Sequence, residues 1–172
     1  VLFRSTRLTR HLLETGARRI AFLGDTGLEE IGRRHQGYLA AHATMRRPAV
    51  PALTRNVPFE RQAVEAEVES LLRSGEVFDA IFCASDLMAM TVIGVLQRHG
   101  RRVPEDVRVG GYDDIALAAY FHPALSTVRQ PIDRAGDQLV ESLLDQLAGQ
   151  APAPRTLETT LIVRDSTRPP GR

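Results

Sequence analysis

The chain alternates short apolar runs with longer segments of helical periodicity, and this alternation constrains its fold more than any other feature. The runs Ile20–Leu23 and Ala80–Phe82 show no polar alternation, as expected of strands covered on both faces. Between them, Glu60–Arg73 carries apolar residues at helical spacing and is followed by Gly75, a common helix terminator. Strands separated by helices predict an α/β fold with a doubly wound, mostly parallel sheet.

The same reasoning assigns the other elements of the chain. Further helices are predicted over Thr6–Thr15, Gly32–Met45, Asp86–His99 and Ile132–Ala148. Further strands are predicted within Arg19–Gly24, Ala49–Val57, Asp79–Cys83, Val107–Gly111, Ser126–Arg129 and Thr156–Val163. Ligands of such sheets bind at the carboxyl ends of the strands, so polar residues that directly follow a strand are the candidates for a binding site.

Composition argues against several classes of function. The net charge of +1 gives no bulk electrostatic reason for this chain to bind nucleic acid by itself. No apolar run approaches the roughly 20 residues of a membrane span, so we expect no membrane partner. The single cysteine, Cys83, excludes an internal disulfide and is expected to be buried. The motifs of dinucleotide-binding, phosphate-loop and serine-hydrolase enzymes are absent, and the histidines are scattered. We therefore expect no enzyme, no cofactor and no metal site.

Three segments carry a family resemblance. They are Ala84–Met90 (ASDLMAM), Val103–Asp114 (VPEDVRVGGYDD) and His122–Pro131 (HPALSTVRQP). In order and spacing they resemble the effector-binding domain of LacI/GalR transcription regulators. That resemblance implies a periplasmic-binding-protein-like fold of type I, in which two Rossmann-like subdomains close around a small molecule. The likeness covers about residues 6–170.

The resemblance also implies how the chain is divided. Residues 1–5 (VLFRS) have no counterpart in the family and are interpreted as a non-native leader. Residues 6–130 correspond to the C-terminal subdomain, and residues 131–160 to a helix and strand that return to an incomplete N-terminal subdomain. Residues 161–172 correspond to the final crossover and the C-terminal end. The DNA-binding headpiece and the remaining sensor domain would lie upstream, which would leave the leucine face of helix 132–148 exposed.

Three residues match ligand-contacting positions of the family. Arg34 corresponds to an arginine that contacts ligand hydroxyls or a carboxylate, Asp113 to an aspartate that accepts hydrogen bonds from ligand hydroxyls or amines, and Gln130 to a hinge position that reaches the effector. Each has a simpler interpretation. Arg34 would be a solvated arginine on a helix. Asp113 would begin an Asx-turn, and Gln130 would form a hydrogen bond between the subdomains.

Ser85, Asp86 and Phe59 complete the candidate ligand site. Ser85 stands where the family often has an asparagine that bonds the effector. Both Ser85 and Asp86 are favoured N-cap residues, so one of them is expected to cap the following helix without excluding ligand contact by the other. Val57 departs from the aromatic that stacks on a sugar ring in the family; either Phe59 substitutes for it or the stacking is lost.

The adjacent carboxylates Asp113 and Asp114 have a further interpretation as an acid–base or metal pair. Neighbouring residues on an extended segment point apart, and no histidine or further carboxylate stands nearby at ligand-like spacing. We do not expect that chemistry.

The function implied by the resemblance is effector binding and dimerisation within a cytoplasmic DNA-binding transcriptional regulator, usually a repressor. Its partners would be a small-molecule effector such as a sugar, a second copy of the chain, and operator DNA through the upstream headpiece. The helices over 60–73 and 86–99 are the candidate dimer surfaces. The alternative is a periplasmic sugar-binding protein of an ABC transporter, which shares the fold. An α/β enzyme is a third interpretation, which the missing motifs disfavour.

Overall fold

A six-stranded sheet forms the centre of the structure, a computed structural model that describes residues 3–151 and 157–168. The strand order is β2-β1-β3-β4-β5-β6, with parallel pairing up to β5 and with β6 antiparallel to β5. The predicted α/β fold with a mostly parallel sheet is confirmed. The strands are β1 (Ile20–Leu23), β2 (Thr54–Arg55), β3 (Ala80–Cys83), β4 (Arg108–Asp113), β5 (Ser126–Arg129) and β6 (Thr160–Ile162).

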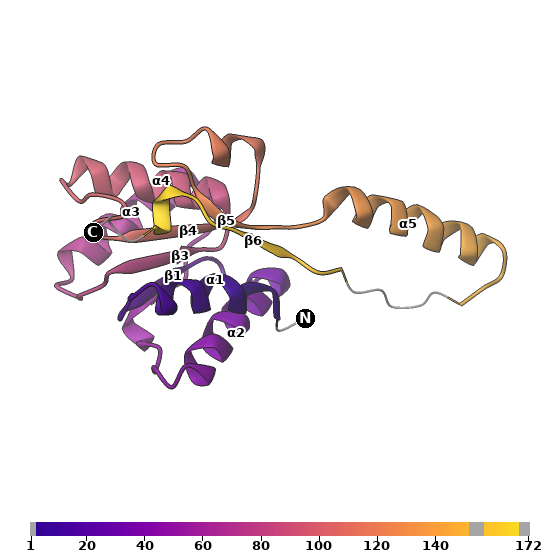
Figure 1. The fold of residues 1–172 in the computed structure, drawn as a ribbon, viewed down its shortest axis with the longest axis horizontal. Coiled ribbons are helices and arrows are strands. Elements are labelled where there is room, and N and C mark those ends of the chain that lie inside the picture. The colour runs from indigo at the N-terminus through magenta and orange to yellow at the C-terminus, as the bar shows by residue number, and fades with distance from the viewer. Residues whose placement is uncertain (1–2, 152–156, 169–172) are drawn as a thin grey trace.

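Helices cover both faces of this sheet (Figure 1). On one face α1 (Phe3–Glu14) packs against α2 (Glu29–Thr44), and on the other α3 (Arg61–Arg73) packs against α4 (Asp86–Arg98). The predicted helices are therefore confirmed, with ends that differ by a few residues. Short 3-10 helices, labelled η, occur at Pro51–Leu53, Ala116–Ala119 and Asp165–Thr167.

The expected strand over Ala49–Val57 is largely wrong. This segment holds a 3-10 turn at Pro51–Leu53, and only Thr54–Arg55 pair with the sheet. Pro51 explains the difference, because its fixed φ suits the first position of a helical turn and its nitrogen has no hydrogen to donate to a strand. The extended segment expected over 156–163 contains strand pairing only at β6, and Thr156 lies outside the described residues.

Helix α1 begins before Thr6, where the first helix was predicted to start, and the interpretation of residues 1–5 as a non-native leader stays a prediction. Residues 3–5, which the sequence analysis set apart as a leader, are helical and form the first turn of α1. Ser5 is buried, and its carbonyl accepts a hydrogen bond from Thr9 Oγ1 at 3.4 Å. Ser5 stands one helical turn before Thr9 and shares its face of the helix, so the packing of α1 extends to it. Residues 1 and 2 lie outside the described part of the chain.

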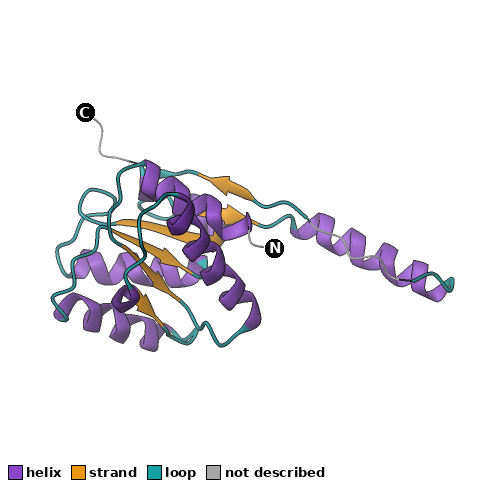
Figure 2. Cartoon of the chain, turned by 90° about the horizontal axis from the view of Figure 1, so that it is seen from below, coloured by secondary structure: helices purple, strands orange, loops and turns teal. Residues whose placement is uncertain are grey.

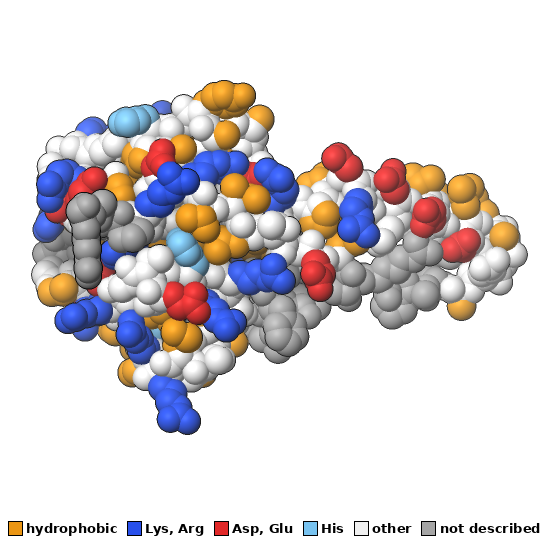
Figure 3. Space-filling model, in the orientation of Figure 1, with side chains coloured by type: hydrophobic (Ala, Val, Ile, Leu, Met, Phe, Trp, Pro, Cys, Tyr) orange, Lys and Arg blue, Asp and Glu red, His pale blue; other side chains and the backbone are white. Residues whose placement is uncertain are grey.

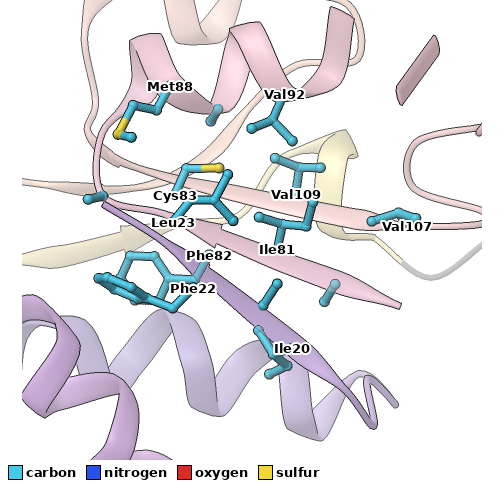
Figure 4. Close-up of a cluster of buried hydrophobic side chains, with 14 of the residues drawn as sticks. Ile20, Phe22, Leu23, Ile81, Phe82, Cys83, Met88, Val92, Val107 and Val109 are labelled. Atoms are coloured by element: carbon cyan, nitrogen blue, oxygen red, sulfur yellow. The ribbon is translucent and has the colours of Figure 1, made fainter. Parts of the chain in front are cut away.

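The hydrophobic core lies along the central strands (Figure 4). Phe22 and Phe82 pack together on one face of the sheet, while Ile81 and Cys83 lie under α4 on the other. All four side chains are fully buried, which explains why these strands lack polar alternation. Cys83 is buried as predicted, and this burial raises the pKa of its thiol, which leaves the thiol un-ionised and unreactive at neutral pH.

Helix α5 (Ile132–Leu147) stands away from the body of the molecule (Figures 1 and 2). β5 leads out to it and β6 returns from it. None of its residues is buried, and its apolar side chains line the projecting arm (Figure 3). The predicted exposure of the leucine face is thus confirmed. A helix of this length is marginal in water by itself, so α5 needs a packing partner from outside the described residues.

Candidate functional site

Arg34, Asp113 and Gln130 lie together at the carboxyl end of the sheet. The Gln130 side-chain amide donates to Asp113 Oδ1 at 2.8 Å, and Arg34 Nη2 lies 3.6 Å from the same oxygen. Asp113 ends β4, Gln130 directly follows β5, and Arg34 projects from α2. The fold therefore brings a fork of donors, a carboxylate and an amide from three segments to the edge where sheets of this kind bind ligands.

The Arg34 guanidinium is held from three sides. It donates to the Ala84 carbonyl, pairs with Asp113, and lies 4.0 Å from the centre of the Tyr112 ring. Only 14% of its side chain is exposed, whereas the neighbouring Arg33 is largely exposed and pairs with Glu29 on its own helix. Arg34 is therefore a pre-oriented donor and not a solvated helix arginine.

Asp113 is partly open to solvent and has a left-handed backbone conformation, with φ of 118°. Burial raises the pKa of its carboxyl, while the charge of Arg34 and the hydrogen bond from Gln130 oppose that shift. Both opposing contacts favour the ionised form. Asp113 can therefore present a carboxylate acceptor beside the Arg34 donors.

Ser85 and Asp86 lie beside this cluster with their side chains turned into the protein. Ser85 caps α4, since its hydroxyl accepts from the Met88 amide at 3.2 Å. Asp86 instead accepts from Thr127 Oγ1 at 2.5 Å and from the Ile115 amide at 2.9 Å. Both residues are buried. Their predicted contact with a ligand stays a prediction.

Phe59 is not brought to the cluster. It lines a different groove, between α3 and α4, where Leu87 and Phe121 also lie. Val57, at the position that the family usually fills with an aromatic, is buried in the core. Stacking of Phe59 on a sugar ring likewise stays a prediction.

Comparison with known proteins identifies the family. The chain matches the periplasmic binding protein-like domain over residues 9–167. It belongs to this family. The predicted resemblance to LacI-type regulators is confirmed, because the relatives and structural neighbours described next are such regulators.

Two curated relatives illustrate the similarity. The HTH-type transcriptional regulator CelR of Thermobifida fusca is 37% identical over 161 residues, which are 92% of this chain and 47% of CelR. The HTH-type transcriptional repressor PurR of Yersinia pestis is 35% identical over 150 residues, which are 87% of this chain and 44% of PurR. This periplasmic binding protein-like chain thus spans somewhat less than half the length of these relatives.

Solved structures agree with this assignment. A sugar-binding LacI-family regulator from Escherichia coli, complexed with phosphate, matches 98% of this chain and 62% of its own, with a TM-score of 0.90 and 33% identity. A complex of the regulator CelR with cellobiose matches 96% of this chain and 51% of its own, with a TM-score of 0.87 and 35% identity. The known proteins that the chain resembles are regulators and not enzymes.

Two features of this periplasmic binding protein-like site were not predicted from the sequence. The first is the Tyr112 ring that faces Arg34. The second is Asp114, whose carboxylate pairs with Arg129 and Arg164. The two aspartates have different partners, and both have left-handed backbone, although the sequence had predicted an extended segment here. The available signal was an arginine at the end of the predicted strand Ser126–Arg129 and another, Arg164, shortly after the last strand.

Neither a metal site nor a membrane segment is visible in the described part of this domain. Across residues 3–151 and 157–168, no three His, Cys, Asp or Glu side chains are grouped closely enough to hold a metal ion. Within the same ranges, no helix combines the length and apolar character that a bilayer crossing requires.

Asp86 gives this domain a specific pH dependence. Burial raises the pKa of its carboxyl to about 6, although the hydrogen bonds from Thr127 and Ile115 act in the opposite direction. The folded state therefore binds the proton more tightly than the unfolded state, so the contribution of Asp86 to stability falls as pH rises from about 4 to 6. In the wild type we expect Asp86 to lower the free energy of unfolding by about 2 kcal/mol as the pH rises over that range. In Asp86→Asn this decrease should be absent.

The measurement is urea unfolding of wild type and Asp86→Asn at pH 4 and pH 7. The difference between the two pH dependences reports Asp86 together with its charge interactions with Asp113 and Asp114. Parallel pH profiles for the two proteins would refute the prediction.

Proposed function

We propose that this chain is the effector-sensing and dimerisation part of a LacI-type transcription regulator, with a neutral, hydroxyl-bearing small molecule such as a sugar as its effector. The observation that carries the proposal is the cluster of Arg34, Asp113 and Gln130 at the carboxyl edge of the sheet. Fixed donors and acceptors that converge on one edge are what a polyhydroxyl ligand needs for orientation.

The charge of the cluster supports an uncharged ligand. Arg34 and Asp113 compensate each other, so an anion would face the carboxylate as well as the guanidinium. A sugar hydroxyl can donate to Asp113 and accept from Arg34 without leaving a charge unpaired. Among similar proteins, CelR is described in complex with cellobiose, and a LacI-family regulator from Enterococcus faecium with bound ribose.

The position of α5 supports a second half of the sensor. The phosphate-bound regulator from Escherichia coli matches 98% of this chain, but this chain covers only 62% of that regulator. The regulator therefore has further residues. A subdomain built from an upstream part of the chain would cover the exposed face of α5 and complete the ligand cleft. Effector binding would then shift the equilibrium between open and closed subdomains, provided that the two states differ in affinity. In a dimer this shift would change the spacing of two headpieces on operator DNA.

The groove between α3 and α4 supports association with a second copy of the chain. Apolar side chains gather there, and Leu87 and Leu117, which line the groove, are exposed to solvent. An exposed apolar patch of this kind marks an interaction surface. The residues that line the groove are Phe59, Arg61, Val64, Glu65, Leu87, Met88, Met90, Thr91, Gly94, Arg98, Leu117 and Phe121.

We expect Leu117→Asp to weaken this dimer at least about tenfold, because two-fold symmetry places the new charge in the interface twice. The measurement is the dimer dissociation constant by sedimentation. It uses the intact protein, which is the product of the complete reading frame. Val77→Asp is the matched control, since Val77 is also an exposed apolar residue but lies before β3, outside the groove. Equal dimer dissociation constants for the two variants would count against this interface.

The DNA sequence upstream of the codon for Thr6 tests the function as a whole. A helix-turn-helix headpiece followed by the rest of the sensor domain would support a cytoplasmic regulator. A secretion signal directly before the sensor domain would instead identify a periplasmic sugar-binding protein of an ABC transporter. The regulator names of the relatives favour the first outcome.

A further inference from the structure

Asp114 joins the two strands that connect the body of the molecule to α5. Its Oδ2 accepts from Arg129 Nε at 2.5 Å, and its Oδ1 accepts from Arg164 Nη2 at 2.8 Å. Arg129 is the last residue of β5, which leads to α5, and Arg164 follows β6, which returns from it. One carboxylate, only 4% exposed, therefore holds both connections.

The same turn carries Asp113. Asp113 and Asp114 both have left-handed backbone, with φ of 118° and 56°. The amide of Asp114 donates to Thr127 Oγ1 at 3.3 Å, and the next amide, of Ile115, donates to Asp86. The turn is thus fixed to β5 and α4 by its backbone, so a backbone shift at Asp113 also acts on Asp114.

The two ion pairs differ in strength. The Arg129 side chain is 55% exposed, so solvent and salt screen its pairing with Asp114. The Arg164 side chain is only 17% exposed and also donates to the Leu125 carbonyl at 2.7 Å, which fixes the direction of its guanidinium. Loss of a buried partner is far more costly than loss of an exposed one, so Arg164 is the main partner.

We propose that Asp114 is a positioning residue of the effector site, which couples the location of Asp113 to the direction of the two strands that lead to and from α5. The inference rests on the proposed function and names a device within it. A ligand contact that shifts the backbone of Asp113 also turns the peptide unit between the two aspartates. This rotation acts directly on the ion pairs of Asp114 with Arg129 and Arg164. It therefore also affects the two strands that lead to and from α5.

The test is hydrogen exchange of the intact protein with Asp114→Asn. Asparagine tolerates left-handed backbone, so the turn is kept while the charge is removed. We expect exchange to become about tenfold faster in residues 113–115, 126–130 and 160–164 together, with β1 and α3 unchanged. Asp165→Asn is the matched control: it removes the same charge from an exposed pair with Arg168 and should leave these segments unaffected.

A second comparison separates coupling from a structural role. Asp113→Asn should change exchange of residues 160–164 in the wild-type background and should not change it further when Asp114→Asn is already present. Uniformly faster exchange throughout the protein, a response confined to one of the three segments, no response, or additive effects of the two substitutions would each overturn the proposal. None of these readouts uses a ligand, so a failure to bind sugar would count against the proposed function and leave this result unaffected.

Discussion

Replacing Asp113 with alanine in the intact protein is expected to weaken sugar binding about 100-fold, because a partly buried, charge-assisted acceptor is lost from the ligand contact. The loss has a second component. Arg34 keeps its contacts with the Ala84 carbonyl and the Tyr112 ring but loses its ion pair with the Asp113 carboxylate. Its uncompensated charge then disfavours a neutral ligand further.

The measurement is titration calorimetry with cellobiose and ribose as probes, on wild type and on variants of two adjacent arginines. Arg34→Ala should weaken the ligand to a similar extent as Asp113→Ala. Arg33→Ala, one residue away, removes only an exposed pair with Glu29 and should leave the affinity unchanged. Binding to operator DNA should persist in all of these variants, because none of them touches the headpiece. Unchanged sugar affinity in both Arg34→Ala and Asp113→Ala would refute the assignment of the site.

The proximity of Asp113 and Gln130 could be predicted because the sheet topology determines where the ends of the strands lie. Parallel strands buried on both faces are visible as apolar runs, and their carboxyl ends meet at one edge. Residues that follow such strands must then be neighbours, although Asp113 and Gln130 are 17 positions apart in the chain. The motif resemblance added the prediction that Asp113 and Gln130 contact a ligand.

The choice between Ser85 and Asp86 as helix cap could not be made from the sequence, because both side chains have suitable oxygens. It is decided by Thr127 and Ile115, which come from elements far along the chain and engage Asp86. Such contacts depend on exact loop positions. For the same reason the pair between Asp114 and Arg164, 50 positions apart, was not predicted.

Gly111→Ala is expected to destabilise the fold by about 3 kcal/mol, since a methyl group here has no space. A Cβ at this position in β4 would lie 2.3 Å from Asp86 Oδ1 and 3.2 Å from the Asp86 Cα. It would also lie 3.1 Å from the Leu125 side chain. Asp86 cannot rotate away at low cost, because its two oxygens are engaged by Thr127 and Ile115.

Urea unfolding of Gly111→Ala and Gly136→Ala measures this effect. Gly136 lies within α5, and a Cβ there would meet no other atom within 4 Å. Its replacement should raise helix content, since alanine is favoured over glycine by about 1 kcal/mol in a helix interior. If Gly111→Ala unfolds at the same urea concentration as wild type, the Asp86 carboxylate is free to move. The turn that carries Asp113 and Asp114 would then lack the fixed support on which its role at the site depends.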